Sequence, residues 1–193
     1  TARYELYWMW SIQYQKESWL MLIDARDVWF QPCAATLILS QLSINLTLPH
    51  FDTSFWQENA DAVRIGISRY NKSWLITAYG EKTVSPYFKQ PVICSGSTIG
   101  SQNGKVNDES NVEGTSRVIV HEQGKGIINN LGALREKPLK EQGMYDAEKQ
   151  LVLNWDGSTS AAAHQYDRNK EVSIVVKTKK RQFEQQWKAL RKC

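Results

Sequence analysis

The sequence predicts an α/β fold, and two observations lead to it. Short apolar runs typical of buried strands, such as residues 19–23 and 91–94, alternate with segments whose pattern favours helices. Hydrophobic residues make up 41% of the 193 positions and charged residues 23%, which is enough for a sizeable core. Neither an internal repeat nor a linker divides the chain. We therefore expect residues 1–193 to form a single domain.

The predicted elements follow one another along the chain as strands and helices. Each strand is assigned from a short apolar or alternating run, and each helix from its spacing and its end signals. Asn71 is expected to cap the N-terminus of one helix and Gly80 to end it. The expected helices cover residues 2–18, 72–79, 116–134 and 180–190. The expected strands cover residues 19–23, 61–69, 91–94 and 151–153. Residues 36–48 are expected to form a strand or an irregular covering segment, and residues 101–115 and 135–150 are expected to be irregular.

The charge and cysteine patterns argue against several classes of partner and site. Much of the net charge of +4 lies in a basic C-terminal segment, which is more typical of a solvated helix face than of nucleic-acid or membrane contact. Three cysteines make no disulfide framework, and the absence of a CxxC spacing argues against a structural zinc site. No apolar stretch reaches the length of a membrane span. We expect no nucleic-acid partner and no membrane contact within this segment.

Two carboxylates follow the first predicted strand directly. Asp24 and Asp27 stand at the carboxyl end of residues 19–23, where open α/β sheets place their ligands. Hard divalent cations bind carboxylate oxygens, and His164 would add an imidazole that suits a transition-type ion such as Mn²⁺. The spacing also fits a surface cluster in which Arg26 pairs with a neighbour, and a lone histidine is more often a core or surface residue. The strand-end position and the combination of three ligand types favour a metal site.

Three further segments each have a structural and a functional interpretation. Residues 94–100 fit a plain turn after a strand, or a backbone that contacts a sugar, and they match neither the P-loop nor the dinucleotide fingerprint. Residues 121–124 fit an exposed helix start, or a carboxylate and an amide that bind sugar hydroxyls. Residues 154–158 fit a turn, or a polar loop that faces an acceptor.

Four motifs, taken in order, resemble those of a GT-A-like glycosyltransferase family. They are LMLIDARDVWFQP, PVICSGSTIGS, HEQGKGIINNL and NWDGSTSAAAHQYDR, and they extend from Leu20 to Arg168. The set is also similar to the glycosyltransferase domain of procollagen lysyl hydroxylases, where an Asp-x-x-Asp pair and a late His bind manganese. The resemblance implies a partial GT-A fold, with a mixed sheet flanked by helices. The chain would be the C-terminal part of such a domain, and the first nucleotide-binding strands would lie upstream.

The resemblance implies a metal-dependent transferase that moves a hexose from a nucleoside diphosphate sugar to a hydroxyl acceptor. It implies that Asp24, Asp27 and His164 bind Mn²⁺, or Mg²⁺ in its place. Glu122 and Gln123 match the family's catalytic acidic–Gln pair, although Glu122 stands where the family has Asp, so its longer side chain would displace the carboxylate. The residues implied in substrate binding are Arg26, Ser95, Gly96, Asp156, Gly157, Tyr166 and Arg168.

An alternative interpretation is a non-catalytic carbohydrate- or partner-binding module on a degenerate transferase fold. The change at Glu122 favours it, and so do eight tryptophans, whose faces stack well on sugars. The two interpretations differ in whether metal removal abolishes function. By analogy with enzymes of this chemistry, the expected location is the ER or Golgi lumen for a eukaryotic protein and the cytoplasm for a microbial one.

Overall fold

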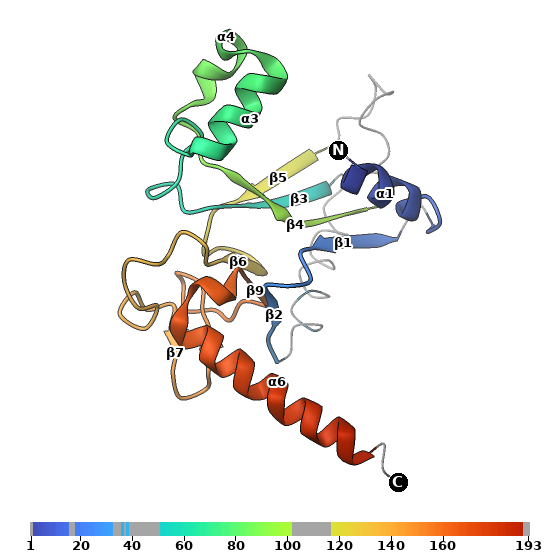
Figure 1. The fold of residues 1–193 in the computed structure, drawn as a ribbon, viewed down its shortest axis with the longest axis vertical. Coiled ribbons are helices and arrows are strands. Elements are labelled where there is room, and N and C mark those ends of the chain that lie inside the picture. The colour runs from blue at the N-terminus through green and yellow to red at the C-terminus, as the bar shows by residue number, and fades with distance from the viewer. Residues whose placement is uncertain are drawn as a thin grey trace.

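The computed structural model describes residues 2–15, 18–32, 36, 38, 51–101 and 117–190. It has a mixed α/β structure with two main sheets, a short hairpin and several helices, as the sequence predicts (Figure 1). The expectations for residues 39–48 and 102–115 lie outside the described residues. Among the described helices, none combines the length and the apolar character needed to cross a bilayer.

The larger sheet has four strands in the order β1-β4-β3-β5. Strands β3 and β5 run parallel, whereas β4 is antiparallel to both of its neighbours. Because β3 and the edge strand β5 are parallel, the chain must cross from one end of the sheet to the other between them. The segment that contains α3 and α4 lies within that connection. The strands are β1 (Trp19–Ile23), β3 (Phe51–Gln57), β4 (Ile93–Ser101) and β5 (Arg117–His121).

The smaller sheet has three strands in the order β2-β9-β6 and lies below the larger one in Figure 1. Strand β2 is antiparallel to β9, and β6 is parallel to it. A two-stranded hairpin follows β6 along the chain. The strands are β2 (Val28–Phe30), β6 (Ile128–Asn130), β7 (Tyr145–Asp146), β8 (Leu151–Val152) and β9 (Ala162–His164).

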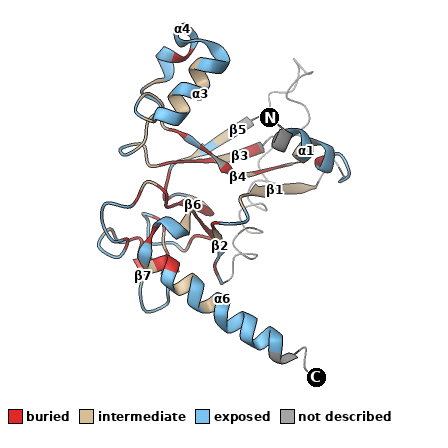
Figure 2. Cartoon of the chain, in the orientation of Figure 1, coloured by how far each residue is buried: buried red, intermediate tan, exposed pale blue. Residues whose placement is uncertain are grey.

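Two apolar clusters hold these parts together. The first lies between the sheets, because Trp56 and Ile99 of the larger sheet pack with Ile128 and Ala162 of the smaller one. The second joins the smaller sheet to the hairpin and the last helix, and its buried members are Leu131, Leu134, Leu139, Met144, Tyr145, Val152, Ala163 and Val172. Figure 2 shows buried residues concentrated along the strands, while most of the last helix is exposed.

The helices differ from the expectations mainly in where they begin and end. The helix predicted over residues 72–79 is α3 (Arg69–Tyr79), because Ser68 and not Asn71 is its N-cap, and Gly80 ends it as expected with φ of 81°. The final helix begins ten residues before the expected start, because Val172 packs in the core and so stabilises its first turns. The described helices are α1 (Ala2–Ser11), α3, α4 (Glu81–Val84), the 3₁₀ turns Ser85–Tyr87 and Tyr166–Arg168, and α6 (Lys170–Leu190).

Three local predictions were wrong. Residues 61–68 form turns and an isolated bridge instead of a strand, and Ile67, which the alternation would bury, is 72% exposed. The helix predicted over residues 116–134 is replaced by β5 and β6, because the β-branched run in β5 pairs with β3. The turn expected after Cys94 is absent, since β4 continues to Ser101 between two partner strands.

Candidate metal centre

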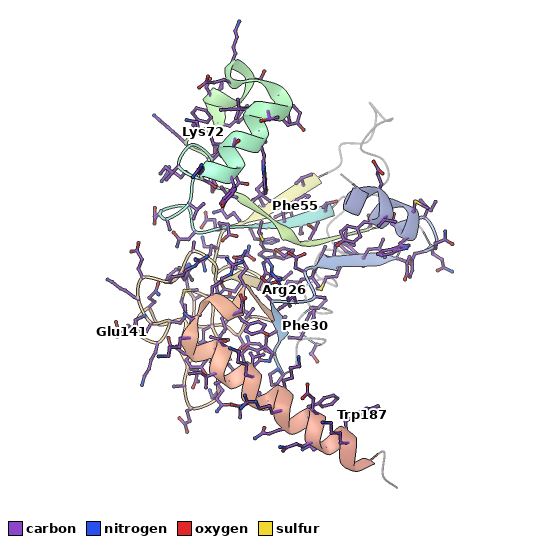
Figure 3. The ribbon with its side chains drawn as sticks, viewed as in Figure 1. Arg26, Phe30, Phe55, Lys72, Glu141 and Trp187 are labelled. Atoms are coloured by element: carbon purple, nitrogen blue, oxygen red, sulfur yellow. The ribbon has the colours of Figure 1, made fainter. Side chains whose placement is uncertain are left out.

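The first acidic residue is positioned by the pairing of β1 with β4. The register places Ile23 opposite Ser97, and the Asp24 backbone N–H continues the ladder by donating to the Gly96 carbonyl at 2.9 Å. Asp24 is therefore the residue at which the chain leaves the larger sheet. Arg26 follows in the bend that leads to β2, where Figure 3 shows it between the two sheets.

The second acidic residue and the histidine are brought together by the smaller sheet. Asp27 directly precedes β2, and its neighbour Val28 is the register partner of His164 at the end of β9. The Tyr166 backbone N–H donates to the Asp27 carbonyl at 3.3 Å, which ties the segment after β9 to the start of β2. Residues 137 positions apart in sequence thus become neighbours through one antiparallel pair.

The three predicted ligands converge on one point. His164 Nε2 lies 3.9 Å from Asp24 Oδ2 and 3.5 Å from Asp27 Oδ1, and one ligand atom from each residue lies within 4.8 Å of the others. Ligand atoms about 2.1 Å from an ion are about 3.0 Å apart at right angles and about 4.2 Å apart when opposite each other. The observed separations are close to that range, so the residues can hold a divalent cation after small side-chain movements.

The environment of His164 also favours a cation. Its side chain is 1% exposed, and Nε2 is a buried nitrogen without a hydrogen-bond partner. Burial lowers the pKa of His164, while the carboxylates of Asp27 and Asp24 act in the opposite direction. A buried polar atom without a partner is costly, and a lone pair aimed at two carboxylates adds repulsion. A bound cation would remove both penalties.

Gly96 of β4 leaves room for this group. A Cβ at Gly96 would lie 2.6 Å from Asp24 Oδ2 and 2.8 Å from His164 Nε2, closer than real side chains approach. The resemblance assigned Gly96 to substrate binding. Its backbone position shows a second role, because any other residue here would displace two of the three candidate ligands. The backbone of Ser95 precedes it in the same strand.

Three buried residues behind His164 were not singled out as site residues by the sequence. Asn130 Oδ1 lies 3.0 Å from His164 Nδ1, and Cys94 Sγ lies 3.3 Å from the same nitrogen. Glu58 hydrogen bonds to Cys94, and burial raises the pKa of the Glu58 carboxyl. Strand β6 has the sequence Ile-Asn-Asn and is buried throughout, and a buried Asn is a signal for such a role because buried amides require partners.

The predicted catalytic pair lies apart from the metal group. Glu122 is exposed and pairs with Lys125 at 2.6 Å, and it lines a different cavity. Gln123 is buried, and its Nε2 donates to Asn129 Oδ1 at 2.8 Å, so its amide supports the local structure. Among the described acidic, His and Cys side chains, the cluster contains Asp24, Asp27 and His164 and does not include Glu122.

The remaining predicted substrate residues divide into two groups. Tyr166 and Arg168 lie two and four positions after His164, and the positive charge of Arg168 adds to the effect of burial in lowering the pKa of His164. Asp156 and Gly157 form an exposed turn, in which Asp156 Oδ1 accepts from the Ser158 backbone N–H at 2.9 Å. The first group is therefore near the candidate ligands, and the second has the turn structure that its composition predicts.

A separate cavity of about 1020 Å³ lies between the α3–α4 segment and the larger sheet. Trp74, Tyr79 and Tyr87 line it and are each more than half exposed. Glu122 and Gln57 contribute polar groups to its wall. The cavity therefore combines aromatic faces with hydrogen-bonding edges.

Comparisons with known proteins identify no relative. No protein-family model, no curated protein and no solved structure matches the chain.

Proposed function

We propose that this chain is the metal-binding part of a GT-A-type glycosyltransferase that moves a hexose from a nucleoside diphosphate sugar to a hydroxyl acceptor. The observation that carries the proposal is the convergence of Asp24, Asp27 and His164, residues that the motif resemblance assigns to the metal. The buried Nε2 without a partner and the space left by Gly96 support a cation at this point.

The donor set favours Mn²⁺, with Mg²⁺ as the alternative, because two carboxylates and one imidazole combine oxygen and nitrogen ligands. When bound, the ion supplies Lewis acidity for the charge that develops on the leaving diphosphate. Asp24 is 39% exposed and Asp27 is 9% exposed, so the group has one side open to a ligand and one side closed by protein. A diphosphate would approach from the Asp24 side.

Arg168 and Arg26 are the proposed contacts for the phosphate charge. Arg168 lies close enough to His164 to affect its pKa, and its side chain is 37% exposed. Arg26 is exposed in the bend between the two acidic ligands. Guanidinium groups bind phosphate oxygens through paired hydrogen bonds, so both residues have suitable chemistry for this role.

The transferase proposal is tested with the full chain, UDP- or GDP-hexose donors and Mn²⁺. We expect nucleoside diphosphate release that requires Mn²⁺, stops with EDTA and is lost in Asp27→Asn. Asp61→Asn is the matched control, because this exposed acid lies outside the metal group and pairs only weakly with Arg64 at 3.9 Å. Release that continues in EDTA or in Asp27→Asn would overturn the proposal.

The aromatic cavity favours a second candidate function, carbohydrate binding without catalysis. Trp and Tyr faces stack on the C–H faces of sugars, while Gln57 and Glu122 can bind hydroxyls. Under this function, glycan binding measured by calorimetry persists in EDTA and is lost in Trp74→Ala. Trp187→Ala is the control, because Trp187 is similarly exposed on α6 away from the cavity. Metal-dependent donor cleavage by the same protein would exclude a purely non-catalytic role.

A further inference from the structure

The buried asparagine at the end of β6 directly faces the candidate metal ligand on β9. Asn130 and His164 are register partners in the parallel pair of these strands, and both side chains are almost wholly buried. Asn130 Oδ1 lies 3.0 Å from His164 Nδ1. The contact is on the opposite ring nitrogen from the one that faces Asp24 and Asp27.

The other hydrogen bonds of Asn130 determine which way its amide points. Its Nδ2 donates to the Trp56 carbonyl and to the Gln57 carbonyl, both at 3.2 Å. Carbonyl oxygens only accept hydrogen bonds, so the amide nitrogen must face them and the oxygen must face His164. An amide oxygen is also only an acceptor, and the nitrogen it faces must therefore carry the hydrogen. His164 is thereby required to be protonated at Nδ1.

The thiol beside Asn130 is consistent with the same protonation. Cys94 Sγ lies 3.3 Å from His164 Nδ1, and the Cys94 thiol also hydrogen bonds to the Glu58 carboxylate. A thiol sulfur is a weak hydrogen-bond acceptor as well as a weak donor, so this contact is compatible with hydrogen at Nδ1 and does not by itself select the tautomer.

We propose that Asn130 is a positioning residue that holds His164 as the Nδ1–H tautomer, so that the Nε2 lone pair faces Asp24 and Asp27 and can bind a divalent cation. The inference rests on the metal centre described under the proposed function and is independent of the sugar-transfer reaction. Partners behind a ligating histidine typically fix its tautomer and ring orientation in this way.

Loss of Asn130 would change what the ring presents to the two acids. Neutral imidazole in water favours hydrogen at Nε2, and the carboxylate oxygen of Asp27 already lies 3.5 Å from that nitrogen. Without the amide oxygen, His164 could donate from Nε2 to Asp27 and so close the metal site. Metal binding would then have to displace this hydrogen, which lowers the affinity.

The tautomer can be measured directly in the metal-free protein. Long-range ¹H–¹⁵N NMR of ¹⁵N-labelled chain in EDTA, at mildly alkaline pH, distinguishes Nδ1–H from Nε2–H histidines. The chain has three histidines, and His50→Gln and His121→Gln variants identify the His164 signals by elimination. We expect the Nδ1–H pattern for His164. An Nε2–H pattern in the wild-type protein would overturn the proposal without any need for an Asn130 variant.

Two substitutions on the same strand test the role of the amide oxygen. Asn130→Leu should abolish the Nδ1–H pattern and weaken Mn²⁺ binding, measured by EPR of the free ion, about 10- to 100-fold. Asn129→Leu is the matched control: Asn129 is equally buried, but it bonds to Gln123 and to the Leu153 carbonyl, and it should leave the His164 tautomer unchanged. Thermal unfolding in EDTA checks that each variant is folded.

Asn130→Asp tests the proposal further and also covers the case in which Asn130→Leu does not fold. The second oxygen of the introduced carboxyl group would face the Trp56 and Gln57 carbonyls, which favours a carboxyl protonated on that oxygen. The first oxygen then remains an acceptor opposite Nδ1, so this variant should retain the Nδ1–H pattern and most of the Mn²⁺ affinity. Loss of the Nδ1–H pattern in Asn130→Asp, or its survival in Asn130→Leu, would contradict the proposal. Tight Mn²⁺ binding with the expected tautomer, but without donor cleavage, would confirm this inference and refute the transferase function.

Discussion

At the scale of single residues, the candidate ligands differ in how far each is removed from water. His164 is 1% exposed, Asp27 9% and Asp24 39%. Electrostatic attraction is stronger where water is excluded, so Asp27 should contribute more to cation binding than Asp24 does. Asp24 is the candidate ligand that solvent reaches most easily.

Asp27→Asn should lower Mn²⁺ affinity at least about 100-fold, because even residues behind the ligands typically cost 10- to 100-fold. Asp24→Asn should cost less, since water can partly replace a ligand at the exposed position. Calorimetric titration of each variant with MnCl₂ measures the difference. Equal losses of Mn²⁺ affinity in the two variants would show that burial does not determine how much each carboxylate contributes. Wild-type affinity in Asp27→Asn would exclude the metal centre.

Glu58→Gln should change how stability depends on pH. Burial raises the pKa of Glu58 in the folded state, so its contribution to stability is complete below the unfolded pKa of 4.5 and is lost as pH rises through the folded pKa. Gln does not ionise, so Glu58→Gln removes this fall in stability with pH. The free energy of unfolding of the variant should therefore rise relative to that of the wild-type protein as pH rises toward neutrality, by no more than about 1.4 kcal/mol per pH unit. Urea unfolding at several pH values measures it. A difference that is constant with pH would argue against the raised pKa.

At the scale of elements, the candidate metal centre lies where the chain passes from one sheet to the other. Strand β1 ends at Ile23 in the larger sheet, and β2 begins at Val28 in the smaller one. The bend between them carries both acids, and β9 presents His164 to it through its pairing with β2. The site therefore depends on the relative position of two sheets, which the shared apolar cluster around Trp56 and Ile128 maintains.

Gly96→Ala should weaken Mn²⁺ binding by on the order of 10- to 100-fold, the loss typical of a disturbed ligand orientation. The added methyl group would lie 2.7 Å from His164 Cε1 and 2.6 Å from Asp24 Oδ2, so at least one ligand must move. Calorimetric titration with Mn²⁺ measures the loss, and thermal unfolding in EDTA checks the fold. Unchanged affinity would mean that the ligands do not occupy these positions when the ion is bound.

At the scale of the whole molecule, the interface between the sheets contains one of the two apolar clusters and also the candidate metal centre. Apolar residues of the two sheets pack there, and beside them lie buried polar side chains such as Asn130, His164 and Asp27. Ions that bind only the folded state stabilise it by mass action. Metal binding should therefore stabilise the joint between the sheets and with it the protein.

Mn²⁺ at about 100 times its dissociation constant should stabilise the protein by about 2.7 kcal/mol, which corresponds to about 5 to 10 °C in Tm for a chain of this size. Scanning calorimetry with and without MnCl₂ measures the shift. His164→Gln should lose the shift, and a surface change such as Asp61→Asn should keep it. A Tm independent of Mn²⁺ in the wild-type protein would contradict the metal centre.

The sequence predicted those parts of the structure that depend on local signals. The apolar run of β1, the end of α3 at Gly80 and the turn at Asp156 were found because the deciding residues are neighbours in the chain. The predictions failed where pairing partners decide. Residues 117–121 form a strand because β3 lies beside them, and residues 170–179 are helical because Val172 packs on the core.

The sequence by itself determined which residue types are available to the candidate centre, because Asp24 and Asp27 directly follow a predicted strand and His164 can add an imidazole. Only the tertiary structure decided that they meet, that Gly96 leaves them space, and that Asn130 lies behind the histidine. The physical reason is register: Asn130 faces His164, and Val28 faces it from the other side, only because of how β6 and β2 pair with β9. Strand pairing joins residues that are distant in sequence, and no local pattern encodes that geometry.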